Sequence, residues 1–202
     1  MSLFRKIFGS KSDDSEEELK SKDRGKYMPE IKLPIDERFT INFKANGGKF
    51  LYCENLDEIF ESLNSILEEN NWADKNALVL DSNLKDRFKN TNLKFHTSLK
   101  DATFFVTTCE NLIADDGSLL ISSNQIAEKK LREFPDNLIV FATTSQMVGN
   151  IGEGLRGIKS KNRKKIPTNI TTIKHFKSHE EKDFMSYGSS SKNLYLLLLE
   201  DL

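Results

Sequence analysis

Residues 102–120 read ATFFVTTCENLIADDGSLL, and this stretch decides most of what the sequence predicts about the fold. An apolar run over residues 103–107 is followed by a polar break, an acidic turn at Asp115-Asp116-Gly117-Ser118 and a second apolar run over residues 118–122. Short apolar runs bounded by turn residues are typical of buried β-strands. We expect the two strands to bring two carboxylates, a glycine and a hydroxyl to one sheet edge, where α/β proteins usually bind ligands.

The rest of the chain alternates predicted strands and helices. Further apolar runs predict strands at residues 49–53, 77–80, 94–96, 137–142, 168–173 and 194–199. Apolar residues spaced three and four apart predict helices over residues 56–67 and 147–158, whereas two prolines predict an extended segment over residues 27–43. Strands that are apolar throughout are covered on both faces, so the pattern favours a three-layer α/β sandwich with a mostly parallel sheet.

Length and composition indicate one domain with a charged tail. The chain has 202 residues, and residues 1–30 carry many charges and few large apolar side chains, so we expect a mobile tail before a domain at residues 31–202. The net charge of −1 gives no reason to expect a nucleic-acid partner. No apolar run approaches the ~20 residues that span a bilayer. Cys53 and Cys109 are interpreted as buried reduced thiols and, with no secretory signal recognised, they favour a cytoplasmic protein.

The acidic turn leaves two interpretations open. Asp115 and Asp116 could take part in acid–base chemistry or hold a metal, but an acidic pair before glycine is also a common hairpin turn. The functional interpretation requires Glu110, Asn111 and Ser118 to share the same sheet edge. A second candidate is the small-residue loop at Gly188 and Ser189, which is either a flexible turn or a source of free backbone N–H groups for an anion.

Three further motifs are interpreted as structural. Residues 152–157 match G-x-G-x-x-G, but the spacing around them is helical, so we expect a helix that packs closely through its small residues. His175 and His179 lack a third ligand in register and are expected at the surface, so no metal site is predicted. The basic run at residues 159–165 is expected to be a solvated helix end, with an acidic partner or anionic ligand as the alternative.

Four segments together resemble the LUD family, the lactate-utilization domain proteins of the LutC/YkgG type. They read NGGKFLYC, TTCENLIADDGSLLISS, FPDNLIVFATTSQMVGNIGEGL and GSSSKNLYLLLLEDL, within a region from residue 39 to residue 202. The resemblance implies a fold similar to the NagB/RpiA/CoA-transferase-like group. It also implies a role in lactate oxidation beside iron–sulfur partner proteins. Two cysteines cannot ligate a four-cysteine cluster, so such a centre would belong to a partner.

The chain departs from the family pattern near its C-terminus. Where the family usually carries a Gly-Pro-Ser element, residues 174–184 read KHFKSHEEKDF, and the family's histidine-bearing glycine loop is reduced to Tyr187-Gly188-Ser189-Ser190. The resemblance implies an accessory subunit of lactate or related hydroxy-acid oxidation, and we expect it to bind a small carboxylate through Gly188, Ser189 and the residues around the acidic turn. A non-catalytic scaffold and a CoA-transferase-like enzyme with Glu110 as nucleophile are the alternatives. The sequence assigns neither a catalytic residue nor a cofactor.

Overall fold

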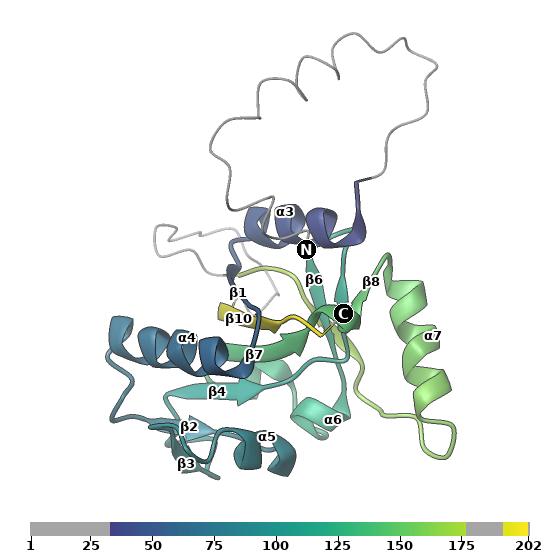
Figure 1. Cartoon of the computed structure of the whole chain (residues 1–202). Helices are drawn as coiled ribbons and strands as arrows, with labels where there is room; N and C mark the ends of the chain where they lie inside the picture. Colours follow the sequence, from purple (N-terminus) through teal and green to yellow (C-terminus); the bar gives the residue numbers. More distant parts are fainter. Residues whose placement is uncertain (1–32, 177–191, 202) are drawn as a thin grey trace, which may run out of the picture. The chain divides into compact units, whose positions relative to one another are not determined.

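The computed structural model describes residues 33–176 and 192–201 (Figure 1), and all of these except Leu33 belong to a compact unit that spans residues 34–202. The described helices are α3 (Ile35–Ala45), α4 (Leu56–Glu69), α5 (Ser82–Arg87), α6 (Ser123–Ile126) and α7 (Ile151–Lys161). The described strands are β1 (Lys49–Cys53), β2 (Asn76–Leu78), β3 (Lys94–His96), β4 (Phe104–Thr107), β5 (Asn111–Ile113), β6 (Ser118–Ile121), β7 (Asn137–Thr143), β8 (Met147–Val148), β9 (Thr171–Ile173) and β10 (Asn193–Leu199). The tail predicted at residues 1–30 lies outside the described residues.

A parallel sheet of six strands forms the centre of the unit. Its strand order is β1-β10-β7-β4-β2-β3, and every neighbouring pair is parallel. The longest pairing joins β10 to β7 over seven residues, from Asn193 opposite Asn137 to Leu199 opposite Thr143. The predicted mixed α/β class and the mostly parallel sheet are therefore confirmed.

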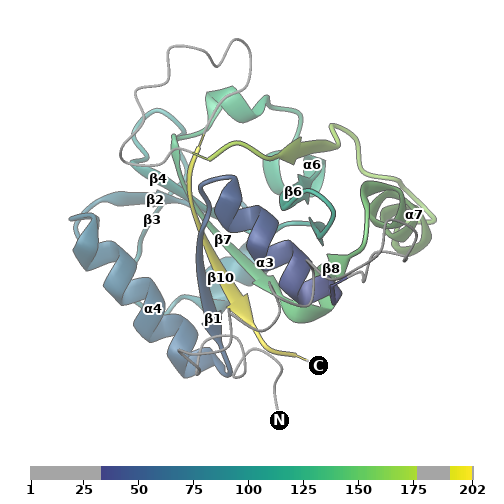
Figure 2. The ribbon, with the colours of Figure 1, turned by 90° about the horizontal axis from the view of Figure 1, so that it is seen from above.

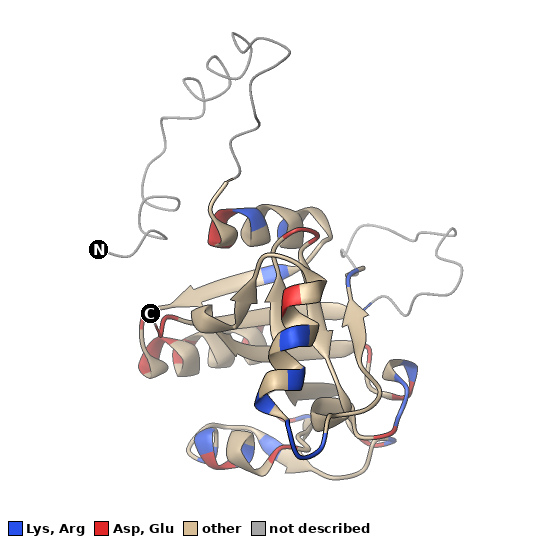
Figure 3. Cartoon of the chain, turned by 90° about the vertical axis from the view of Figure 1, so that its right-hand side faces the viewer, with Lys and Arg blue, Asp and Glu red and all other residues tan. Residues whose placement is uncertain are grey.

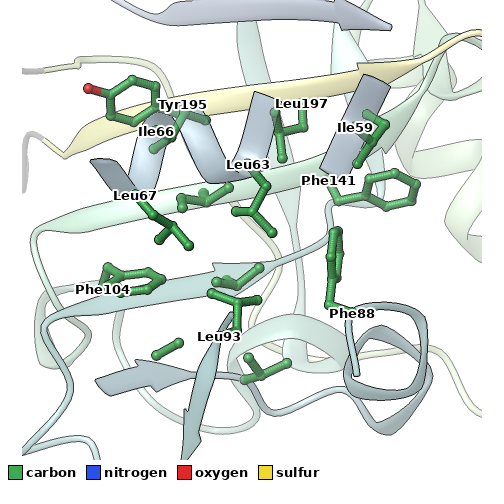
Figure 4. Close-up of a cluster of buried hydrophobic side chains, with 14 of the residues drawn as sticks. Ile59, Leu63, Ile66, Leu67, Phe88, Leu93, Phe104, Phe141, Tyr195 and Leu197 are labelled. Carbon is green, nitrogen blue, oxygen red and sulfur yellow. The ribbon is translucent and has the colours of Figure 1, made fainter. Parts of the chain in front are cut away.

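Both faces of the central strands are buried, as their continuous apolar sequences predict. In β7, Ile139 and Phe141 face a core that α4 and α5 cover, together with Tyr195 and Leu197 of β10 (Figure 4). The alternate residues of the same strands point to the opposite face, and they are also buried: Leu138, Val140, Ala142, Leu194, Leu196 and Leu198 are at most 1 % exposed. A sheet buried on both sides needs a layer on each side.

The layer on the second face contains a smaller sheet of its own. Strands β8, β5, β6 and β9 pair in that order, and α7 packs on the outside of this sheet through Ile158 against Ile113 and Leu120. Figure 2 shows α4 on one side of the parallel sheet and β6, α6 and α7 on the other. This arrangement is consistent with a three-layer α/β sandwich in which one outer layer combines helices with the small sheet.

The expected extended segment over residues 27–43 is wrong for its second half, because α3 begins at Ile35. Pro34 is the N-cap of this helix, a position where a missing backbone N–H costs nothing. Phe39 and Phe43, four residues apart, are fully buried and lie on one face of the helix. A proline that precedes a helix therefore marks its start.

The predicted helix over residues 147–158 begins later than expected. Met147 and Val148 form β8, which pairs with β5, and α7 starts at Ile151 after its N-cap Asn150. The side chain of Asn150 accepts a hydrogen bond from the Glu153 backbone N–H at 3.0 Å. An asparagine cap thus ends the strand pairing and starts the helix.

Within the described residues, no helix combines the length and the apolar content needed to cross a membrane.

Candidate functional site

The acidic turn at residues 115–118 connects β5 to β6 and lies against α3. Asn42 Nδ2 donates to the backbone oxygens of Ala114 at 2.8 Å and of Asp115 at 3.2 Å. Asn46 Nδ2 donates to the backbone oxygen of Asp116 at 2.7 Å. Asn42 of α3 and Asn46, the C-cap of this helix, therefore satisfy the carbonyl groups of a turn that is 70 to 73 residues away in the sequence.

The two aspartates of the turn are both paired. The Arg38 guanidinium lies 2.8 Å from Asp115 Oδ1, and the Lys174 ammonium lies 3.6 Å from Asp116 Oδ2. Asp116 Oδ1 also accepts hydrogen bonds from the Ser118 backbone N–H at 3.1 Å and from its hydroxyl at 2.6 Å. An aspartate that bonds the residue two positions ahead is the usual feature of an Asx-turn. These contacts give Asp115 and Asp116 a structural role: they shape the turn and fix the hairpin to α3.

Glu110 directly precedes β5, at the end of this strand that is opposite the acidic turn. Its carboxylate is bound by side chains that follow β6, and not by α3. Its Oε1 atom accepts hydrogen bonds from the Ser122 hydroxyl at 2.6 Å and from Asn124 Nδ2 at 2.8 Å. Among the described residues, its Oε2 atom has no hydrogen-bond partner. Ser122 is also the N-cap of α6, so the carboxylate is positioned by a rigid helix start.

Gln146 supports the same region from the loop after β7. Its Nε2 atom donates to the backbone oxygen of Cys109 at 2.6 Å and lies 3.4 Å from that of Glu110. Its backbone oxygen accepts a hydrogen bond from Asn111 Nδ2 at 3.1 Å. We call Glu110, Ser122, Asn124 and Gln146 the Glu110 cluster.

The predicted site residues therefore fall into two groups. Asp115, Asp116, Gly117 and Ser118 are at the turn, whereas Glu110 and Asn111 begin the hairpin at its other end. Five residues of extended chain span roughly 16 Å, so a single small ligand does not contact both groups of carboxylates. Asn111 is buried and holds the Gln146 backbone rather than facing solvent. Gly188 and Ser189 lie outside the described residues.

The carboxyl ends of β7 and β10 are joined by Asp201. Its Oδ1 atom accepts hydrogen bonds from the Thr144 hydroxyl at 2.9 Å and the Ser145 backbone N–H at 2.8 Å, and its Oδ2 atom accepts one from the Ser145 hydroxyl at 2.7 Å. Partial burial by itself raises the pKa of this carboxyl, but the hydrogen bonds from Ser145, Thr143 and Thr144 together outweigh it and lower the pKa below its ordinary value. The charged form is therefore the one that the fold favours.

Replacing Asp201 by Asn is expected to destabilise the protein by roughly 1 kcal/mol at pH 7, because a charged acceptor of three hydrogen bonds is lost. The lowered folded-state pKa means that the stabilisation is fully present above the unfolded-state pKa near 4 and disappears as the pH falls through the folded-state value. Urea unfolding of both proteins at pH 7, 4 and 3 measures this. The free-energy difference should shrink toward acid, and a constant difference would contradict it.

Neither cysteine is placed to act as a nucleophile. Cys109 is buried beside the Glu110 cluster, and burial, with a further contribution from the nearby Glu110 carboxylate, strongly raises the pKa of its thiol. Burial likewise raises the pKa of Cys53. Both thiols are free in the structure. Because the thiolate is the reactive form, the cysteines fill space in the core.

The remaining motifs occupy ordinary structural positions. The three glycines at residues 152, 154 and 157 lie inside α7 rather than in a strand-to-helix turn, and a Cβ at Gly154 would approach Leu120 Cδ2 to 3.0 Å. Close packing of this helix through Gly154 is therefore confirmed. His175 is exposed, as predicted, and His179 lies outside the described residues. Among residues 33–176 and 192–201, no three His, Cys, Asp or Glu side chains are grouped to hold a metal ion.

Sequence reasoning missed Ser122, Asn124, Gln146 and Asp201, although two of them carry a recognisable signal. Ser122 and Gln125 form a capping box, and so do Thr143 and Gln146. In both segments a hydroxyl residue precedes a glutamine by three positions, which is the capping-box pattern. That pattern locates two strand-to-helix junctions at the carboxyl ends of β6 and β7. It does not show that they meet Glu110.

Comparison with known proteins identifies the family. A sequence model of the LUD domain matches residues 37–199. No curated protein matches this sequence. Among solved structures, the crystal structure of a DUF162 family protein from Deinococcus radiodurans is similar in fold, with a TM-score of 0.59 and 14 % sequence identity over 86 % of this chain and 100 % of that chain. The family match covers the hairpin, the Glu110 cluster and every described strand of both sheets, and the chain belongs to the LUD domain family, which is associated with lactate utilization.

Proposed function

We propose that this protein is an accessory subunit in the oxidation of lactate or a related hydroxy acid, acting with partner proteins that carry iron–sulfur clusters. The observation that carries the proposal is the LUD domain match over residues 37–199. The cysteine content supports the assignment of the iron–sulfur clusters to the partner proteins, because a chain with two cysteines cannot supply the four thiolates of an ordinary cluster. Electron transfer would then belong to the partners.

The Glu110 cluster is the proposed ligand site of this subunit. Glu110 lies just after the carboxyl end of β4, and Gln146 follows the carboxyl end of β7, at the edge where parallel α/β sheets bind ligands. The carboxylates of Asp115 and Asp116 are engaged by Arg38 and Lys174. These ion pairs favour Glu110 over the acidic turn.

The geometry suits a hydrogen bond to a substrate hydroxyl. Ser122 and Asn124 fix the Glu110 carboxylate through Oε1, so Oε2 keeps a defined position at which it can accept a proton donor. The hydroxyl of a 2-hydroxy acid is such a donor. In this proposal, backbone N–H groups at Gly188 and Ser189 bind the substrate carboxylate.

A cytoplasmic location is part of the same proposal. Cys53 and Cys109 are unpaired and buried in separate positions, and proteins of reducing compartments generally keep their thiols free.

The subunit role is tested by deleting the gene in its own organism and measuring growth on lactate. We expect slow growth on lactate and normal growth on glucose, restored by the wild-type gene. Purification of the tagged chain from lactate-grown cells should recover a protein with the absorbance of an iron–sulfur cluster near 400 nm. Normal growth of the deletion strain on lactate and on other 2-hydroxy acids would rule out the role.

The ligand site is tested separately with Glu110→Gln. Loss of a charged hydrogen bond is expected to weaken binding of lactate to the purified protein by about tenfold, measured by calorimetry. The matched control is Glu69→Gln, which removes an exposed carboxylate at the end of α4 and should bind as the wild type does. Equal affinity in both variants would reject the Glu110 site while leaving the subunit role intact.

A further inference from the structure

Helix α7 and the loop after it carry the most concentrated positive charge in the described part of the chain. Six cations fall within ten consecutive residues, and all of them are exposed: Arg156, Lys159, Lys161, Arg163, Lys164 and Lys165. None of the six forms an ion pair or a side-chain hydrogen bond with another described residue. In Figure 3, which colours Lys and Arg blue, blue segments of the ribbon follow one another along this helix and the loop after it. Uncompensated charge of one sign on a protein of net charge −1 is a feature that attracts an anionic partner.

Two large apolar side chains of α7 lie beside this charge. Ile151 is 47 % exposed and Leu155 is 41 % exposed, whereas Ile158 on the adjoining face is buried against the small sheet. At 100° per residue, Ile151, Leu155, Lys159 and Arg156 follow one another around the helix, which places an apolar strip next to a basic strip. We call these four residues the α7 patch.

Gly152 lies beside the residues of the α7 patch, and a Cβ added to it would be 3.6 Å from Arg156 Nη1. By the same helical geometry it falls between Lys159 and Arg156, and it has no side chain to hold a partner away. The patch runs from residue 151 to residue 159 of α7, which is about 12 Å along the helix axis. That length matches about two turns of a second helix packed alongside.

We propose that the α7 patch is a docking surface for an acidic amphipathic helix of a partner protein. The partner would place apolar side chains on Ile151 and Leu155 and carboxylates opposite Arg156 and Lys159. Helix-in-groove recognition of this kind uses anchors at i, i+3, i+4 and i+7. Because the patch is positively charged, the contacting face of the partner helix should carry negative charges. Because the patch also exposes two aliphatic side chains, the same face should carry apolar residues.

Composition favours a protein partner over nucleic acid or a membrane. Residues 151–175 contain no aromatic residue. Proteins that bind single-stranded nucleic acid rely on aromatic stacking. A helix that binds at a membrane interface buries its whole apolar face in the lipid, whereas α7 exposes only Ile151 and Leu155 and packs Ile158 against the small sheet. The docking surface is independent of the hydroxy-acid site, since α7 contributes no side chain to the Glu110 cluster.

A selection experiment on the full-length chain tests this. A display library of 14-residue helical peptides, randomised at every position, is selected on the wild-type protein. It is counter-selected on Arg156→Glu/Lys159→Glu. We expect the enriched peptides to carry acidic and aliphatic residues at helical spacing, and the best of them to bind the double variant at least about tenfold more weakly than the wild type. Leu155→Ser should weaken it by about fivefold.

The matched control for charge is Lys89→Glu/Lys129→Glu, which changes the net charge equally at two exposed lysines outside α7. It should change the affinity of the selected peptide by less than about twofold at physiological salt. Enriched peptides without acidic residues, or an equal loss of affinity in the control, would overturn the proposal. So would tighter binding of the protein to vesicles containing 30 % phosphatidylserine or to a 20-nucleotide DNA than to the peptide.

Discussion

Replacing Gly117 by alanine is expected to destabilise the protein by roughly 3 to 5 kcal/mol, because two unfavourable terms act together. Gly117 has φ +67°, in the left-handed region where a Cβ is strained by its own backbone. In addition, a Cβ at this position would lie 2.3 Å from the Phe43 backbone nitrogen and 2.4 Å from the Asn42 carbonyl carbon. These atoms belong to the backbone of α3, so they cannot rotate away as a flexible side chain would.

The hairpin can accept the methyl group only by moving away from α3. That movement would break the hydrogen bonds from Asn42 and Asn46 to the turn and would separate Asp115 from Arg38. Urea unfolding followed by circular dichroism measures the loss of stability. A free energy of unfolding within 1 kcal/mol of the wild type would contradict the interpretation of the turn as a fixed contact.

The matched control is Gly157→Ala in α7. A Cβ at Gly157 would meet no atom within 4 Å, and this residue lies inside a helix. Alanine there is expected to stabilise the protein by about 0.5 to 1 kcal/mol, because alanine loses less backbone entropy than glycine on forming a helix. The same substitution therefore has opposite signs at the two sites.

Replacing Lys192 by methionine is expected to cost about 2 to 4 kcal/mol. This lysine is fully buried at the start of β10, and its ammonium donates to the backbone oxygens of Phe134 at 2.9 Å and Pro135 at 3.2 Å. It also lies 3.3 Å from a carboxylate oxygen of Asp136. Methionine preserves much of the buried volume but leaves the two carbonyl groups without this donor.

Thermal and urea unfolding measure the effect, and Lys94→Met is the matched control. Lys94 forms an ion pair with Asp74 at 2.8 Å, but the two side chains are 55 % and 90 % exposed. Exposed ion pairs contribute little to stability, because water and salt screen their charges, so the control should remain close to the wild type. Equal losses in the two variants would show that burial of the Lys192 ammonium is not the source of the stability.

The fold class could be predicted because strands that are buried on both faces appear in the sequence as continuous apolar runs. Residues 138–142 and 194–199 are apolar at every position, and the structure covers both faces of β7 and β10. The start of α3 could not be predicted from Pro34 alone, since proline is compatible with both an extended segment and a helix N-terminus. The buried pair Phe39 and Phe43, spaced for a helix, decides between them.

The candidate site could be predicted only in part. Residues 103–107 and 118–122 were both expected to be strands that converge on the acidic turn. The structure assigns β4 to the parallel sheet and pairs β6 with β5 in the small sheet. The strand β5, which the sequence did not predict, consists of Asn111, Leu112 and Ile113. The prediction had placed these three residues in the polar segment after β4.

The sequence by itself determined the local character of most segments: which long runs are buried strands, which glycine lies in a turn, and which side chains can cap a helix. These properties depend on neighbours within a few residues, and periodicity and residue type record them. Only the tertiary structure decided that Asp115 and Asp116 serve the contact with α3 while Glu110 joins Ser122, Asn124 and Gln146 at the other end of β5. That division depends on which strands pair and on contacts between residues more than 70 positions apart, and strands of similar apolar sequence do not specify their partners.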